Sequence, residues 1–141
     1  MTATLLSLPL PAPKKEASSQ DHKHWGQLQG SSAALCISQA LSQYKGPIVL
    51  ITADTPSAMK LEKEIAFFLS DNTKHTPITL FPDWETLPYD SFSPHQDIVS
   101  QRLETLFRFT QQGEGIFIVP VNTLMQRLAP TDYLAKYLLM L

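Results

Sequence analysis

Three short runs of apolar residues, at 48–53, 78–81 and 116–121, most constrain the fold of this 141-residue chain. None of them alternates polar and apolar residues, as a strand with one wet face would. Continuous apolar runs of this length are typical of strands buried on both faces of a parallel sheet. Stretches with helical spacing separate the runs. The order therefore predicts an α/β fold, in which helices cover both faces of a parallel sheet.

The helices expected between these runs have defined starts and buried faces. Each is expected to begin at a residue that can cap it or fit its first turn: Ser31 or Ser32, Thr55 with Pro56, Asp97, and Asn122 or Thr123. The buried faces expected for the two longest helices are Ala58, Leu61, Ile65, Phe68 and Leu69, followed by Val99, Leu103, Leu106 and Phe107. The single cysteine, Cys36, lies between apolar neighbours and is expected to be a small buried residue rather than a nucleophile.

Residues 80–97 form a stretch that neither helix nor strand patterning explains. Pro82, Pro88 and Pro94 fix backbone angles and remove N–H donors, so no helix or central strand can run through it. Its apolar and aromatic residues are too numerous for a solvated linker. An ordered loop held by aromatic side chains is the consistent interpretation, and such loops often carry function. The alternative is a loop that only caps the core.

Six residues of this loop form the candidate interaction site: Asp83, Trp84, Glu85, Tyr89, Asp90 and His95. We expect Trp84 and Leu87 to turn inward over the carboxyl ends of the strands, so that Trp84→Ala would cost on the order of 3 kcal/mol. The polar members are expected to stay in water and to contact other domains. Paired acids can also serve catalysis or bind a metal. Loop acids beside Pro and Ser more often cap turns, so we assign no catalytic or metal-binding residue.

The segment 26–32, GQLQGSS, lies where a phosphate-binding loop would precede the first helix. A working loop needs a Lys and a magnesium-binding hydroxyl at fixed spacing from its glycines. Here the spacing is one residue short, and Ser31 stands where the Lys belongs. Gly26, Gly30, Ser31 and Ser32 therefore predict a degraded loop without nucleotide, and no cofactor is assigned to this chain. His22 and His24 alone are too few to hold a metal.

Charge and composition restrict the possible partners. A net charge of −2 and a pI near 6.0 argue against a free-standing domain that binds the nucleic-acid backbone. Arg102, Arg108 and Arg127 would form a basic patch only if folding brings them together, and they could equally pair with Glu104 or Glu114. The sequence has no run of ~18 apolar residues, so no membrane span is predicted. One cysteine excludes an internal disulfide and fits a reducing, cytoplasmic location.

Three segments are expected along the chain. Residues 1–24 form a flexible tail, because prolines and polar residues offer too little apolar surface to offset ordering. Residues 25–130 form the α/β domain. Residues 131–141 read as the truncated start of a following domain, although a terminal helix docked on the core would have the same pattern.

Two stretches carry a family resemblance: LFPDWETLPYDSFSPHQDIVSQRLETL at 80–106 and IFIVPVNTLMQRLAP at 116–130. They resemble the N-terminal region of bacterial transcription-repair coupling factors, which is itself similar to the first domain of the excision-nuclease subunit UvrB. The resemblance is dense from residue 46 to 130 and thin from 25 to 45. It implies a fold like that of P-loop NTPases and of UvrB domain 1a, with the nucleotide site degraded. The tyrosine-rich hairpin with which UvrB clamps damaged DNA has no counterpart here.

The resemblance also implies what the parent protein does. Such factors recognise RNA polymerase stalled at a DNA lesion and displace it by translocating on double-stranded DNA. The motor uses ATP and Mg, as in superfamily 2 helicases, and the protein recruits UvrA. The present chain would then be a non-catalytic scaffold in contact with other domains of the parent. The alternatives are a nucleotide-binding α/β enzyme domain and a free-standing nucleic-acid-binding domain, and fold alone does not separate them.

Overall fold

The computed structural model describes residues 24–41, 44, 46–69, 76–86, 91, 93–111, 115–130 and 133–134. Its sheet has three parallel strands, β1 (Pro47–Thr52), β2 (Ile78–Leu80) and β3 (Gly115–Pro120). The strand order is β1-β3-β2, so the last strand in sequence is the central one. The prediction of a parallel α/β sheet is confirmed.

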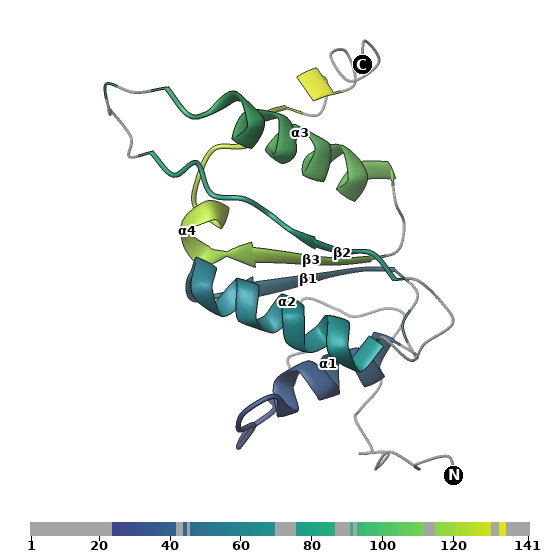
Figure 1. Ribbon diagram of the computed structural model, residues 1–141. Helices are drawn as coiled ribbons and strands as arrows, with labels where there is room; N and C mark the ends of the chain where they lie inside the picture. Colours follow the sequence, from purple (N-terminus) through teal and green to yellow (C-terminus); the bar gives the residue numbers. More distant parts are fainter. Residues whose placement is uncertain are drawn as a thin grey trace.

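Helices lie on both sides of this sheet. They are α1 (Ser32–Leu41), α2 (Thr55–Leu69), α3 (Gln96–Gln111) and the short α4 (Val121–Leu124). Helix α2 packs on one face with α1 outside it, whereas α3 lies on the opposite side (Figure 1). The first layer is therefore two helices deep, and the second is a single helix.

The core extends from the central strand through α2 to α1. Ile116 and Ile118 of β3 are fully buried and belong to one cluster with Ala34, Ala58 and Ile65. This arrangement confirms the buried stripe predicted for α2, since its other three members pack against the same cluster. The α1 residue expected to be buried, Cys36, is 1% exposed and carries a free thiol.

The start of α2 differs from the expectation. The Asp54 carboxylate accepts a hydrogen bond from the Ser57 N–H at 2.8 Å, so Asp54 rather than Thr55 caps the helix. Two hydrogen bonds from Ser57 lower the pKa of Asp54: the larger effect comes from the Ser57 side chain and the smaller from its backbone N–H. The prediction was wrong by one residue because both residue types favour this position.

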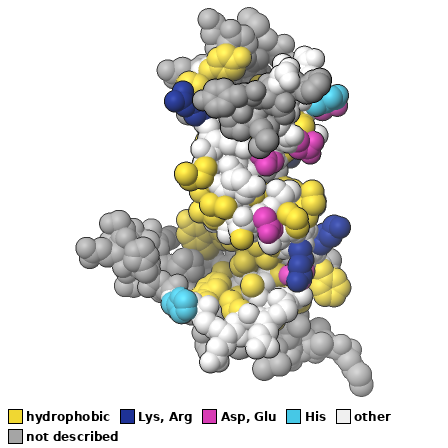
Figure 2. Space-filling model, turned by 90° about the vertical axis from the view of Figure 1, so that its left-hand side faces the viewer, with side chains coloured by type: hydrophobic (Ala, Val, Ile, Leu, Met, Phe, Trp, Pro, Cys, Tyr) yellow, Lys and Arg dark blue, Asp and Glu magenta, His cyan; other side chains and the backbone are white. Residues whose placement is uncertain are grey.

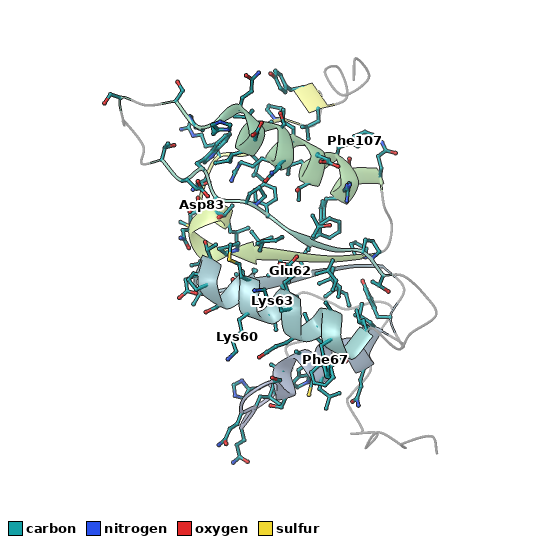
Figure 3. All side chains as sticks on the ribbon, viewed as in Figure 1. Lys60, Glu62, Lys63, Phe67, Asp83 and Phe107 are labelled. Atoms are coloured by element: carbon teal, nitrogen blue, oxygen red, sulfur yellow. The ribbon has the colours of Figure 1, made fainter. Side chains whose placement is uncertain are left out.

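Helix α3 was predicted with the wrong cap and a partly wrong inner face. The ring nitrogen Nδ1 of His95 accepts from the Asp97 N–H at 3.3 Å, so His95 is the capping residue. Phe107 is 37% exposed and lies on the side of α3 away from the sheet (Figure 3), while Arg102 and Thr105 are buried. Phe107 was wrongly assigned to the inner face because a buried arginine, which the pattern treats as polar, occupies that side.

The chain after β3 also departs from the prediction. Helix α4 begins at Val121 with Pro120 as its N-cap residue and without a side-chain cap, so Asn122 and Thr123 do not begin it. The expected tail, apart from His24, lies outside the described residues. Of the segment 131–141, only residues 133 and 134 are described, and Leu134 is buried.

Candidate functional site

The candidate interaction loop leaves β2 at its carboxyl end and stays attached to the sheet for one further residue. The Phe81 N–H donates to the Ile118 carbonyl of β3 at 2.8 Å, and the Phe81 ring is buried. Pro82 then ends the pairing, since it has no N–H to donate. The loop therefore starts from a fixed point on the central strand.

Arg102 of α3 anchors the next residues. Its guanidinium donates from Nη1 to the Pro82 carbonyl at 2.6 Å. The guanidinium carbon lies 4.6 Å from the ring centre of Phe81 and 4.2 Å from that of Trp84, so two aromatic faces cover it. Burial lowers the pKa of Arg102, and the nearby Asp83 carboxylate opposes this shift. An arginine remains charged after such a shift, so a buried cation holds the loop on α3.

Asp83 fixes the same loop to the segment after α4. Its Oδ1 accepts from the Trp84 N–H at 2.8 Å and from Nε2 of Gln126 at 2.6 Å. Asp83 is half-buried and lies beside α4 (Figure 3). The expectation that it stays in water was therefore wrong: its hydrogen-bonding capacity serves the fold.

Two other members of the candidate site are at the surface. Glu85 is exposed and adopts a φ of 59°, a left-handed conformation that is strained for a residue with a Cβ. His95 is exposed, with Nδ1 3.3 Å from the Asp97 carboxylate. The structure thus brings Asp83 and Trp84 together on a rigid base and leaves Glu85 and His95 outside it. Trp84 turns inward as predicted, but its ring packs on Arg102 of α3, and no contact with the strand ends is seen among the described residues. Leu87, Tyr89 and Asp90 lie outside the described residues.

The glycine-rich segment before α1 uses its polar groups locally. The Ser31 hydroxyl donates to Oε1 of Glu64 at 3.0 Å, and the Ser32 hydroxyl donates to the Gln29 carbonyl at 2.7 Å. Gly30 has a φ of 57°. Gly26 and Gly30 are exposed. A carboxylate therefore stands beside the residue that would have to face a phosphate.

This segment also lies away from the edge where a sheet of this kind holds nucleotide. Ligands of such sheets bind at the carboxyl ends of the strands. Strand β1 ends at Thr52, shortly before Asp54, which caps the start of α2. Ser31 contacts Glu64, roughly ten residues and about 15 Å further along that helix. The start of α1 is positioned by α2 rather than by a strand.

Two of the three arginines singled out in the sequence have partners of their own. Arg108 pairs with Glu104 through Nη2 at 2.7 Å, which confirms one of the two expected alternatives. Arg102 has the role that sequence reasoning missed, together with Gln126. The available signal was an arginine in the second turn of the predicted helix, next to the apolar position Leu103.

The part of the chain that the structure describes contains no group of three His, Cys, Asp or Glu side chains placed to hold a metal ion. No described helix is long and apolar enough to cross a membrane.

Comparison with known proteins finds relatives that match most of this chain over a short region of their own length. No family model matches the chain. It is 44% identical over 121 residues to the transcription-repair-coupling factor of Haemophilus influenzae and 43% identical over 116 residues to that of Escherichia coli. The factor of Mycobacterium tuberculosis (strain CDC 1551 / Oshkosh) is 31% identical over 107 residues. These matches cover 86%, 82% and 71% of this chain, but only 10%, 10% and 8% of the relatives. The chain thus spans about a tenth of their length.

Proposed function

We propose that this chain, a homologue of a short region of the transcription-repair-coupling factors, is a non-catalytic scaffold and interaction module of such a factor. The identity of 44% across 86% of the chain carries the proposal. The complete protein would recognise RNA polymerase stalled at a lesion and displace it by ATP- and Mg-dependent translocation on double-stranded DNA. It would also recruit UvrA, and it would work in the cytoplasm.

The proposed ancestry of the domain is a P-loop NTPase fold of the UvrB domain 1a type whose nucleotide site has been lost. Two observations support the loss. Ser31 replaces the lysine and donates to Glu64, and the segment lies about 15 Å along α2 from the strand ends. The rival function, a nucleotide-binding enzyme domain, has no comparable support in the described residues.

The interaction surface is the exposed part of the loop, represented by Glu85 and His95. Its base is rigid, because Arg102 and Asp83 tie the preceding residues to α3 and to Gln126. A rigid base presents surface groups at a fixed position, which lowers the entropic cost of binding. We assign these groups to contacts with other domains of the parent, including contacts that restrain the motor.

The test is the double substitution Glu85→Ala and His95→Asn in the complete factor. Both side chains are exposed, and asparagine can still cap α3 in place of His95, so the melting temperature should not change. ATP hydrolysis measured without DNA or polymerase should change, because a restraining contact is weakened. Lys63→Ala, an exposed position on α2 (Figure 3), is the matched control and should alter neither quantity. Unchanged hydrolysis in the double variant would show that this loop does not restrain the motor.

A second measurement concerns UvrA. We expect the 141-residue chain to capture UvrA poorly and a longer piece, extended through the next domain, to capture it well. Equal capture by both would place the recruiting site within this chain.

A further inference from the structure

One hydrogen bond joins the candidate interaction loop to the segment that follows the central strand. Nε2 of Gln126 donates to Oδ1 of Asp83 at 2.6 Å, and we call this contact the latch. Gln126 comes shortly after α4, which continues directly from β3. The latch therefore ties the loop to the sheet, whereas Arg102 ties it to α3.

The latch leaves the other half of the Gln126 amide unpaired. Its carbonyl oxygen, Oε1, is buried and has no hydrogen-bond partner among the described residues. An amide turned the other way round would set this oxygen against the Asp83 carboxylate, so the charge of Asp83 fixes the observed orientation. A buried acceptor without a partner costs free energy of the same order as a hydrogen bond to a charged group contributes. The net stabilisation from the latch is therefore small.

The hydroxyl of Thr123 is a second buried polar group without a partner. Thr123 is fully buried, and its Oγ1 makes no hydrogen bond with a described residue. It lies three residues before Gln126 in one turn of the chain, where the Gln126 N–H donates to the Thr123 carbonyl at 3.2 Å. Side chains three residues apart in a helical turn are neighbours. A hydroxyl can donate and an amide oxygen can accept, so each unpaired group is the partner that the other lacks.

Among the described residues, the cavity beside Thr123 offers its hydroxyl no other partner. The cavity has a volume of about 190 Å³, and apart from two threonines its lining is apolar. The second threonine, Thr105, donates its own proton to the Gln101 carbonyl at 2.8 Å within α3. Hydrophobic side chains also gather in the middle of the face that looks onto the strand ends (Figure 2). The amide of Gln126 is therefore the acceptor to which the Thr123 hydroxyl is best placed to donate.

We propose that Gln126 is a two-position switch at the base of the interaction loop. In the observed, major position its Nε2 donates to Asp83; in the second position its Oε1 accepts from the Thr123 hydroxyl, and Asp83 is released. The second position satisfies both unpaired groups. The released carboxylate keeps the Trp84 N–H as a donor and the attraction of the Arg102 guanidinium. Gain and loss are of the same order, which allows both positions to be populated.

The switch would regulate the surface groups Glu85 and His95, and this role rests on the proposed function. In the observed position the loop is tied both to α3 and to the sheet, so the two groups keep a fixed separation. In the second position the tie to the sheet is lost. A domain that contacts both groups at once binds the latched position better and draws the equilibrium toward it.

Fluorine NMR of the complete factor, labelled with fluorotryptophan, tests the two positions. The Trp84 resonance is assigned by its loss in Trp84→Phe. Wild type should show relaxation dispersion at this resonance. Thr123→Val keeps the shape of the side chain but removes the second position, so the dispersion should disappear. Gln126→Leu removes the latch and should displace the resonance without dispersion.

Thr105→Val is the matched control for Thr123→Val. Both threonines are buried in the lining of the same cavity, but the Thr105 hydroxyl is already paired within α3. This control should keep the dispersion of the Trp84 resonance. Wild type without dispersion, or dispersion that survives in Thr123→Val, would overturn the proposal.

ATP hydrolysis by the complete factor, measured without DNA or polymerase, tests the regulatory role separately. Gln126→Leu should change it in the same direction as the double variant of Glu85 and His95, whereas Thr123→Val keeps the latch and should not. Unchanged hydrolysis in Gln126→Leu beside an altered double variant would overturn the regulatory role and leave the proposed function standing. Unchanged hydrolysis in both would overturn the proposed function and this role with it, while the dispersion at Trp84 would still support the two positions.

Discussion

The guanidinium carbon of Arg102 lies 4.2 Å from the centre of the Trp84 ring, and the same guanidinium donates to the Pro82 carbonyl at 2.6 Å. One buried cation thus stacks on an aromatic ring of the loop and donates a hydrogen bond to a backbone carbonyl of the loop. Arg102 is only 3% exposed, and Phe81 covers it from a second direction. This clamp explains how a segment with no regular structure can present surface groups at a fixed place.

Trp84→Ala should destabilise the domain by about 2–3 kcal/mol, through loss of apolar burial and of the stacking on Arg102. The side chain is half-buried, so the cost should lie at the low end for a tryptophan. Trp84→Phe keeps an aromatic face over the guanidinium and should recover much of the loss. Chemical denaturation of the three proteins measures both effects. A Trp84→Ala protein with unchanged stability would mean that the ring is a free binding surface.

Asp83→Ala and Glu85→Ala should behave differently, although the two acids are two residues apart. Asp83 accepts hydrogen bonds from Gln126 and from the Trp84 backbone, so its loss should cost about 1–2 kcal/mol. Glu85 is exposed, and alanine can occupy the same backbone conformation with a similar strain. Its replacement should be neutral within about 0.5 kcal/mol. Equal effects in denaturant titrations would contradict the assignment of Asp83 to the fold.

The contrast between these acids shows what patterning could and could not predict. Continuous apolar runs predicted the three parallel strands, but the expected burial on both faces holds only for β3, since β1 alternates exposed and half-buried residues. The inward turn of Trp84 followed from prolines that exclude a regular element. The roles of Asp83 and Arg102 did not follow, because each depends on one long-range partner, Gln126 or the aromatic pair. Polar residues that become buried by pairing look like surface residues in any periodic pattern.

The cap of α2 should make stability depend on acid pH. The hydrogen bonds from Ser57 lower the pKa of Asp54 in the folded state, so the cap stabilises the fold above the unfolded pKa of this carboxyl. The contribution is lost as the pH falls through the lowered folded value. Asp54→Ala should therefore melt earlier than wild type near neutral pH, and the gap should narrow below the ordinary carboxyl pKa of 3.8.

Asp54→Asn supplies the control for this pH dependence. Asparagine caps a helix about as well as aspartate but does not titrate. The melting difference between Asn and Ala at this position should therefore stay constant with pH. A wild-type advantage over Asp54→Ala that is unchanged down to pH 2 would show that the carboxylate charge is not responsible.

Calorimetric titration of the 141-residue chain with Mg-ATP tests the central claim, a module without a nucleotide site, most directly. The titration should be flat to millimolar ATP, because Ser31 stands where a lysine is needed and donates instead to Glu64. The double change Ser31→Lys and Glu64→Gln should also fail to bind, since the segment lies about 15 Å along α2 from the strand ends. A micromolar dissociation constant for the wild-type chain would contradict the account.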